Sequence, residues 1–208
     1  MTKTIIWGRT NSINVQKVLW CAAEIGLDFE RIDAGMEHGV TKTPEYLAKN
    51  PNSLVPTLEE GEFVLWESNV IVRYLSAKYA EGTLCPTDPQ ERAHADQWMD
   101  WQATTLWATA RLVFWGLVRT PPEKRDQAQI DKAVVDSERA LAMLESWLST
   151  RDFVAAGRLT MGDIPIGASV YRWFAMGMDR SKFPNVARWY DRLTQREGFQ
   201  KHIMLPLS

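Results

Sequence analysis

The sequence predicts two domains of different class, a mixed α/β domain followed by an all-α domain. In the first eighty residues, short apolar runs alternate with helical patterns and turn residues, as in small mixed sheets with covering helices. From residue 91 onward, nearly every segment repeats its apolar residues at three- and four-residue steps, which indicates helices. Residues 81–90 contain a glycine and two prolines and are the best linker candidate. The chain of 208 residues therefore divides into domain 1 at residues 1–80 and domain 2 at residues 91–208.

Domain 1 begins with a pattern that predicts a strand, a helix and a second strand. Residues 4–7 are a short apolar run that Gly8 ends. Apolar side chains then follow at helical spacing over residues 15–25, and Gly26 is a suitable stop for that helix. Residues 29–33 alternate like a second strand, and a helix that connects two strands makes them parallel.

The second half of domain 1 predicts a hairpin followed by a helix. After a loop and one helical turn at residues 46–48, two apolar runs at residues 55–59 and 63–66 flank a glycine-containing turn. Ser68 can serve as the N-cap of the next helix. Because hairpin strands are antiparallel, the complete sheet is expected to be mixed.

Domain 2 predicts a set of packed helices. A long first helix carries one apolar face and ends at two consecutive prolines, and residues 130–148 form a second apolar stripe. Residues 160–163 match a capping box in which Asp replaces the usual Glu. Pro165 follows closely and lacks a backbone N–H, so this helix is expected to kink or to start late. A last helix is expected at residues 186–195.

Composition and charge exclude several classes of protein. Lys and Arg number 24 and Asp and Glu 26, so the net charge of −2 lacks the basic excess of a nucleic-acid binder. Cys21 and Cys85 are too few for a disulfide scaffold or a four-thiolate zinc site. The three histidines share no ligand spacing with these cysteines. We therefore expect no metal and no nucleic-acid partner.

The chain shows no targeting or membrane segment. Residues 1–7 lack the apolar stretch of a signal peptide, and no run approaches the ~20 apolar residues of a membrane span. We expect a soluble, cytoplasmic protein that does not bind membranes. The 10 tryptophans are unusual, and most of them are expected in the core because aromatic side chains supply large contact areas.

The polar loop at residues 9–14 is the first of three places where chemistry is expected. It follows the first strand, and ligands of open α/β sheets bind at the carboxyl ends of strands. The helix that follows adds free N–H groups and a positive dipole end, which suit an anion such as a thiolate. The alternative is a plain polar turn in which Asn14 or Ser12 caps the helix, and the loop alone does not decide between the two.

The other two places lie in the second half of domain 1. Val55-Pro56 precedes a strand and is either a cis peptide, which turns the Val55 backbone toward an extended ligand, or an ordinary trans bond. At residues 66–69 a strand ends and a helix begins, so its free N–H groups can hold a carboxylate while Glu67 pairs with an amino group. Together these groups recognise an α-amino acid; the alternative is a simple Ser68 cap.

The order of these places, in a small mixed domain before a helical one, resembles the cytosolic glutathione transferases over essentially the whole chain. The resemblance rests on the Ser12 loop and on residues 50–58, 66–75 and 162–164. It is strongest to bacterial members of the serine-type classes, theta-, beta- or nu-like, and residues 101–106 are similar to a theta-class stretch. It implies a thioredoxin-like domain that binds glutathione, followed by a helical-bundle domain that shapes the electrophile pocket.

The resemblance also implies how the thiol of glutathione is activated. Ser12 matches the activating serine, and its neighbours Asn11 and Thr10 can share or replace that role. A free thiol has a pKa of about 8.5, and lowering it by ~1.5 units takes ~2 kcal/mol of thiolate stabilisation. One or two hydrogen bonds to the charged sulfur, at ~1.5–3 kcal/mol each, are sufficient. Ser12 would act as a donor and not as a nucleophile.

The remaining roles follow from the same resemblance. Val55, next to Pro56, would pair with the cysteinyl backbone of glutathione, and Glu67 and Ser68 would hold its γ-glutamyl head. Lys42 is the better match for the glycyl carboxylate and His38 the weaker one.

The electrophile site is expected on the long helix of domain 2 and near its end. The candidates are Trp107, Arg111, Trp115 and Arg119. An arginine beside aromatic rings can accept an acidic or polarised electrophile. In the alternative, the tryptophans are interdomain core and Arg111 pairs with an acid.

The leading functional prediction is an enzyme that conjugates glutathione to small electrophiles, including halogenated acids or arenes. Glutathione is then the co-substrate, no metal is needed, and a homodimer is expected from the family. The alternatives are a glutathione-dependent disulfide reductase or peroxidase and a non-catalytic module with the same fold. The site residues favour a working glutathione site and leave the second substrate open.

Overall fold

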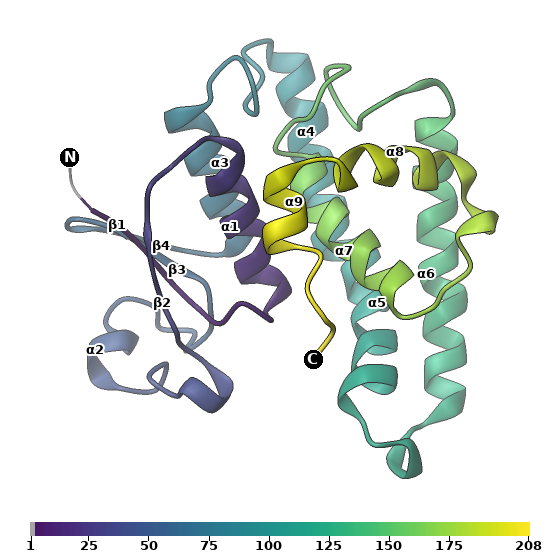
Figure 1. Cartoon of the computed structure of the whole chain (residues 1–208), viewed down its shortest axis with the longest axis horizontal. Helices are drawn as coiled ribbons and strands as arrows, with labels where there is room; N and C mark the ends of the chain where they lie inside the picture. The colour runs from purple at the N-terminus through teal and green to yellow at the C-terminus, as the bar shows by residue number, and fades with distance from the viewer. Residues whose placement is uncertain (1–2) are drawn as a thin grey trace.

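A computed structural model describes residues 3–208 and shows the two predicted domains side by side (Figure 1). Residues 1 and 2, which are part of the N-terminal segment where no signal peptide is expected, lie outside the described residues. The elements of domain 1 are β1 (Thr4–Trp7), α1 (Ile13–Glu24), β2 (Glu30–Ile32), α2 (Pro44–Leu47), β3 (Thr57–Glu60), β4 (Phe63–Trp66) and α3 (Ser68–Tyr79). A short 3₁₀ turn, η1 (Met36–His38), lies in the loop after β2.

The four strands form one mixed sheet in the order β2-β1-β3-β4. β1 runs parallel to β2 and antiparallel to β3, and β3 and β4 form the predicted hairpin. In this register Trp7, Thr57 and Trp66 are paired across β1, β3 and β4. The three loops that carry the candidate site residues therefore leave the sheet at the same edge.

Domain 2 consists of α4 (Pro89–Trp101), α5 (Trp107–Phe114), α6 (Gln127–Trp147), α7 (Asp163–Ala175), α8 (Pro184–Thr194) and α9 (Glu197–His202). α4 begins inside the range 81–90 that the sequence predicts as a linker. The predicted long helix is α4 and α5 together, and it contains two π-helical stretches at Gln102–Leu106 and Trp115–Arg119. Such stretches are uncommon and concentrate at functional sites. α9 was not predicted.

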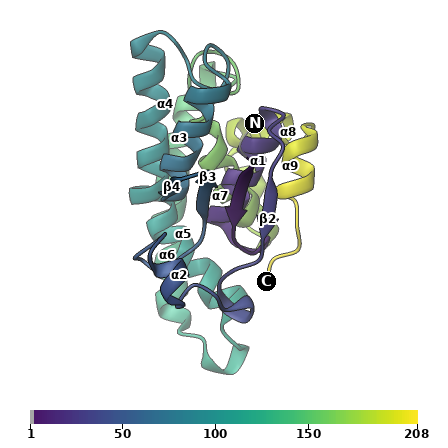
Figure 2. The ribbon, with the colours of Figure 1, turned by 90° about the vertical axis from the view of Figure 1, so that its left-hand side faces the viewer.

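α1 and α3 lie between the sheet and domain 2 (Figures 1 and 2). α1 is consequently buried around most of its circumference and not on one face only. Its Trp20 is completely buried and stacks edge-on against Phe199 of α9, with ring centroids 4.8 Å apart. The same ring also packs against α7 at Gly167, where a Cβ would lie only 3.0 Å from it.

The structure corrects the predicted start of α3 and shows the late start expected of α7. The N-cap of α3 is Glu67, so the prediction of Ser68 as the cap is wrong by one residue, and Ser68 is the first helical residue. α7 begins at Asp163, whose carboxylate accepts a 2.9 Å bond from the Thr160 N–H, so one half of the predicted capping box is formed. Pro165 then falls in the first turn, where its missing N–H costs no helical bond. The expected late start is thereby observed.

Across residues 3–208, no helix combines the length and apolar character that crossing a membrane requires.

Candidate active site

Ser12 occupies the N-cap position of α1 but does not use its side chain as a cap. Its backbone carbonyl accepts the Gln16 N–H at 2.9 Å, whereas its hydroxyl makes no capping bond. The residue is 9% exposed, so the hydroxyl lies at the end of a helix in a largely buried position. Ser12 can therefore donate to an anion placed at the positive end of the α1 dipole.

The neighbours of Ser12 are less suited to that role. Asn11 donates from Nδ2 to the Ser208 hydroxyl at 3.0 Å, and its backbone carbonyl accepts a bond from Arg172 at 2.8 Å. Its Oδ1 is buried and has no partner among residues 3–208. Thr10 is exposed. These contacts commit Asn11 to holding the loop and leave the Ser12 hydroxyl as the better placed donor.

Val55 follows a loop that is tied to the sheet by buried side chains. The Tyr46 hydroxyl and the Asn50 amide donate to the Leu54 carbonyl at 2.7 and 3.0 Å, and Asn50 also reaches the Thr57 hydroxyl. The Val55-Pro56 bond is cis. Neither the N–H nor the C=O of Val55 has a backbone partner within residues 3–208, so both can pair with an extended ligand.

Glu67 and Ser68 lie at the turn where β4 ends and α3 begins. Glu67 has φ +72°, a value that non-glycine residues seldom adopt and that concentrates at functional sites. Ser68 is 5% exposed. This turn and the Val55 loop share a small cavity, to which α1 contributes one residue. The cavity is lined by Asn14, Asn50, Asn52, Leu54, Val55, Pro56, Trp66, Glu67 and Ser68.

A second cavity lies on the other side of the Ser12 loop. It measures about 350 Å³ and is lined by Arg9, Thr10, Asn11, Glu37, His38, Leu205, Pro206 and Ser208. The chain's last residues thus close one side of it. The predicted His38 is part of this lining, but its Nε2 lies 3.4 Å from the carboxylate of Glu37. Lys42 is exposed, lies outside both linings, and makes no ion pair within residues 3–208.

Three arginines from distant parts of the chain influence one another beside the Ser12 loop. They are Arg9 after β1, Arg119 at the end of the second π-helical stretch and Arg172 on α7. The Nε atoms of all three are buried and lack hydrogen-bond partners among the residues described. Arg172 donates only to neutral oxygens, the Asn11 carbonyl at 2.8 Å and Gln16 Oε1 at 3.2 Å. We call these residues the arginine cluster.

The arginine cluster has no ion-pair partner among residues 3–208. Burial lowers the pKa of Arg172 to about 10, and the positive charge of Arg119 adds to that shift. Burial also lowers the pKa of Arg9, with Arg119 acting in the same direction and Glu37 against it. With a pKa of about 10, the Arg172 guanidinium stays charged at neutral pH. The result is a concentrated positive potential next to Ser12.

Aromatic rings support this cluster. The guanidinium carbon of Arg172 lies 4.5 Å from the centroid of the Phe114 ring and 6.0 Å from that of Trp107. That of Arg119 lies 5.9 Å from Phe114. Of the four predicted electrophile-site residues, Trp107 and Arg119 are therefore brought together. Arg111 and Trp115 are exposed, and within residues 3–208 neither takes part in the ring and cation–π pairs of the cluster.

Sequence reasoning missed Arg9, Phe114 and Arg172. Arg9 lies inside the predicted loop at residues 9–14, so the sequence could have identified it as a site residue. Arg172 lies within an apolar helix, Asp163–Ala175, where a single arginine gives no pattern. Within residues 3–208, no three His, Cys, Asp or Glu side chains lie together as a metal site would require.

Two family models match the chain, and they correspond to its two domains. The N-terminal domain of glutathione S-transferases matches residues 2–77, and the C-terminal domain of the same family matches residues 106–197. Together the two models cover most of the sequence.

The chain belongs to the glutathione S-transferase family.

Relatives of this transferase extend over its full length. Glutathione S-transferase GstB of Escherichia coli (strain K12) is 43% identical over 205 residues, which cover 98% of this chain and 99% of GstB. The theta-class glutathione S-transferase of Xanthomonas axonopodis pv. citri, solved with glutathione bound, is 46% identical, with full coverage of both chains and a TM-score of 0.95. Glutathione transferase BmGSTD1 of Bombyx mori is 30% identical over 98% of this chain and 94% of its own, with a TM-score of 0.87. The predicted enzyme, with a thioredoxin-like domain before a helical domain, is confirmed.

Proposed function

We propose that this transferase conjugates glutathione to small electrophiles that carry a negative charge, such as halogenated carboxylic acids. The observation that supports this most is the arginine cluster beside Ser12. Buried charges are normally paired, because an unpaired charge away from water is costly. Three guanidinium groups without a carboxylate partner are suited to an anionic substrate.

The peptide would lie along the first cavity. The γ-glutamyl head would meet Glu67 and Ser68, the cysteinyl backbone would pair with Val55, and the sulfur would accept a hydrogen bond from Ser12. The register of β1, β3 and β4 supports this, because it places the three loops at one edge of the sheet. Lys42, with His38 as second choice, is proposed for the glycyl carboxylate.

The chemical step is a nucleophilic substitution. The thiolate attacks the carbon that bears the halogen, a C–S bond forms, and the C–halogen bond breaks with the electron pair leaving on halide. Ser12 lowers the pKa of the bound thiol, and the arginine cluster adds to that effect because it favours every anion near it. The carboxylate of the electrophile, held by the cluster, orients the reacting carbon.

A matched pair of electrophiles tests the proposal. Iodoacetate and iodoacetamide react with thiols in the same way and differ in charge. After subtraction of the uncatalysed rate, kcat/KM is expected to be at least about tenfold higher for iodoacetate, as for one hydrogen bond to a charged group. Arg119→Gln should reduce this preference, whereas Arg180→Gln, which removes a surface arginine paired with Asp191, should not. Equal or faster turnover of the amide would contradict an anionic substrate.

The same assay should include a peroxide and a mixed disulfide, since both belong to the alternative functions. Neither cysteine of the chain favours redox chemistry through a protein thiol. Burial raises the pKa of Cys21 to about 12 and also raises that of Cys85, so both remain thiols at neutral pH. If the peroxide or the disulfide is reduced faster than iodoacetate is conjugated, the protein is a glutathione-dependent peroxidase or disulfide reductase.

A homodimer is also part of the proposal. Four large apolar side chains around the hairpin and α3 are 37–65% exposed, namely Leu54, Phe63, Trp66 and Val70. Exposed apolar residues that lie near one another mark interaction surfaces. Light scattering is expected to give twice the chain mass, and Phe63→Glu to shift the protein toward the monomer. A wild-type monomer at micromolar concentration would contradict this.

We propose a cytoplasmic location on the basis of the cysteines. Both thiols are free and buried, which fits a reducing compartment. Fractionation of the cells that make the protein is expected to recover it with cytoplasmic enzymes.

A further inference from the structure

Lys17 is a lysine enclosed in the molecule without an acidic partner. It lies on α1, five residues after Ser12, and is 3% exposed. Its Nζ donates to Asn69 Oδ1 at 3.0 Å, and it forms no ion pair within residues 3–208. Lysines are almost never fully buried unless they are paired, so packing alone does not account for this residue.

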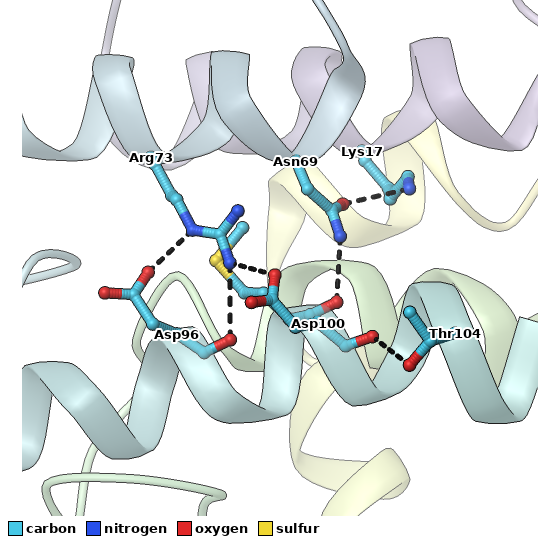
Figure 3. Close-up of polar contacts among 7 residues, drawn as sticks. Lys17, Asn69, Arg73, Asp96, Asp100 and Thr104 are labelled. Carbon is cyan, nitrogen blue, oxygen red and sulfur yellow. Dashed lines mark hydrogen bonds and ion pairs between the residues drawn. The ribbon is translucent and has the colours of Figure 1, made fainter.

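Asn69 is held at both ends of its amide. Its Oδ1 accepts from Lys17 on α1, and its Nδ2 donates to the Met99 carbonyl on α4 at 2.9 Å (Figure 3). An ammonium group can only donate and a carbonyl can only accept, so the residue between them needs a donor and an acceptor. An amide provides both. Asn69 thus connects three helices through a single side chain.

The α4 end of this connection is reinforced by its neighbours. Arg73, one turn along α3 from Asn69, donates to the carboxylates of Asp96 and Asp100 (Figure 3). The Asp100 carbonyl accepts a 2.9 Å bond from the Thr104 hydroxyl, which lies in the first π-helical stretch. Widened helical turns are places where side chains enter the backbone hydrogen-bond ladder. α3 is therefore fixed to α4 at two points.

The turn that precedes Asn69 needs such support. Glu67, two residues before it, has φ +72°, and a conformation of this kind persists only where the surroundings enforce it. Glu67 also interacts electrostatically with Lys17. Burial lowers the pKa of Lys17 to about 7, and the negative charge of Glu67 opposes that change. Lys17 therefore acts on the turn through a hydrogen bond and through charge.

We propose that Lys17 is a positioning residue for the γ-glutamyl end of glutathione, acting through Asn69 on the turn formed by Glu67 and Ser68. The inference rests on the proposed assignment of that turn to the γ-glutamyl head. Because α1 also begins directly after Ser12, one helix then positions both the thiol and the γ-glutamyl head of glutathione.

The direct test compares glutathione binding with turnover in Lys17→Met, which keeps most of the side-chain length and removes the donor. KM for glutathione is expected to rise about 10-fold and kcat to change less than about twofold, since the sulfur end of the site is untouched. Calorimetric titration with S-methylglutathione should show the same loss of affinity, because this probe has no thiol to ionise. Lys78→Met is the matched control, since Lys78 lies at the far end of α3 and pairs with Glu60.

A second variant separates positioning from folding. Lys17→Met leaves Asn69 Oδ1 buried without a donor, which can lower stability. Removing both partners restores an apolar contact, so Lys17→Met/Asn69→Leu is expected to recover the thermal midpoint while the affinity for S-methylglutathione stays low. Wild-type affinity in a folded Lys17→Met protein, or in the double variant, would overturn the inference.

Glu67→Gln distinguishes the two levels of the proposal. If this variant and Lys17→Met both weaken S-methylglutathione binding, the inference is supported. If only Glu67→Gln weakens it, the turn is the γ-glutamyl site and Lys17 does not position it. If Glu67→Gln binds normally, the assignment of the turn is wrong, and the inference fails with it.

Discussion

Two buried cations lie on either side of the start of α1, and they behave differently. Arg172 belongs to the arginine cluster, and its pKa of about 10 keeps it charged at neutral pH. Lys17 faces the proposed γ-glutamyl turn, and its pKa of about 7 places it near the midpoint of its titration. A guanidinium spreads its charge and is weakly hydrated, whereas an ammonium is a compact, strongly hydrated charge. The enzyme therefore has a permanent positive region at one end of its site and a proton-dependent one at the other.

The surroundings of the two residues match this difference. Arg172 has two hydrogen-bond acceptors and the faces of Phe114 and Trp107, which stabilise a cation without neutralising it. Lys17 has one neutral acceptor, Asn69. We therefore expect the arginine side to determine which electrophile reacts and the lysine side to determine how well glutathione is held.

The largest effect is expected for Arg172→Gln. This variant removes the most enclosed charge of the arginine cluster, and a hydrogen bond to a charged group is worth about 1.5–3 kcal/mol. kcat/KM for iodoacetate should fall about 100-fold, with a smaller loss for iodoacetamide. Steady-state kinetics at saturating glutathione provide the measurement. Equal losses for both electrophiles would mean that Arg172 only holds the Ser12 loop.

Ser12 lies between the arginine cluster and Lys17, and Ser12→Ala is expected to have an intermediate effect on turnover. Loss of one hydrogen bond to the thiolate should raise the pKa of bound glutathione by about 1 unit and lower turnover at pH 7 roughly 10-fold. Affinity for S-methylglutathione should remain near wild type. The pH–rate profile is the diagnostic measurement, and an unchanged profile would move the role to Thr10 or Asn11.

The last prediction concerns stability and not activity, through the contribution of Lys17 to the pH dependence of unfolding. Its pKa is about 7 in the folded protein and 10.5 as the reference value, so between these values the unfolded state binds more protons. The free energy of unfolding of the wild type, relative to Lys17→Met, should therefore increase as the pH rises from about 7 toward 10. The slope should approach ~1.4 kcal/mol per pH unit. Urea titrations at pH 7, 8 and 9 measure it, and parallel curves for both proteins would contradict the buried, titrating lysine.

Sequence patterns predicted most of the fold because its strands and most helices have clear periodicity. β1 and β4 agree with their predicted ranges, and α6 begins three residues and ends one residue before its apolar stripe. The cap of α3 was misplaced because Ser68 has the favoured residue type, while the unusual φ of Glu67 is visible only in three dimensions. The two π-helical stretches could not be predicted, because the apolar spacing of the sequence there also fits an ordinary α-helix.

Site residues could be predicted where the local sequence marks them, at the ends of strands. Residues that reach the site only through tertiary contacts could not. The Ser12 loop, Val55 and Glu67 stand at strand ends that the sequence marks. The apolar residues of the predicted helix at residues 15–25 lie on one face. Lys17 is not on that face, so the sequence predicts that it is exposed to solvent. In the folded protein α3, α7 and α9 pack around α1, so a residue whose position predicts exposure becomes a buried lysine.

The shared starting point of the three site loops has a further consequence. Trp7, Thr57 and Trp66 are paired on neighbouring strands, which lie ~4.8 Å apart. The sheet therefore fixes the spacing of the three loops that begin or end at these residues. A slip of β3 by a single residue would shift Val55 by ~3.3 Å along the strand direction and reverse the faces of the strand. The proposed glutathione site would therefore depend on the pairing of the strands as well as on its side chains.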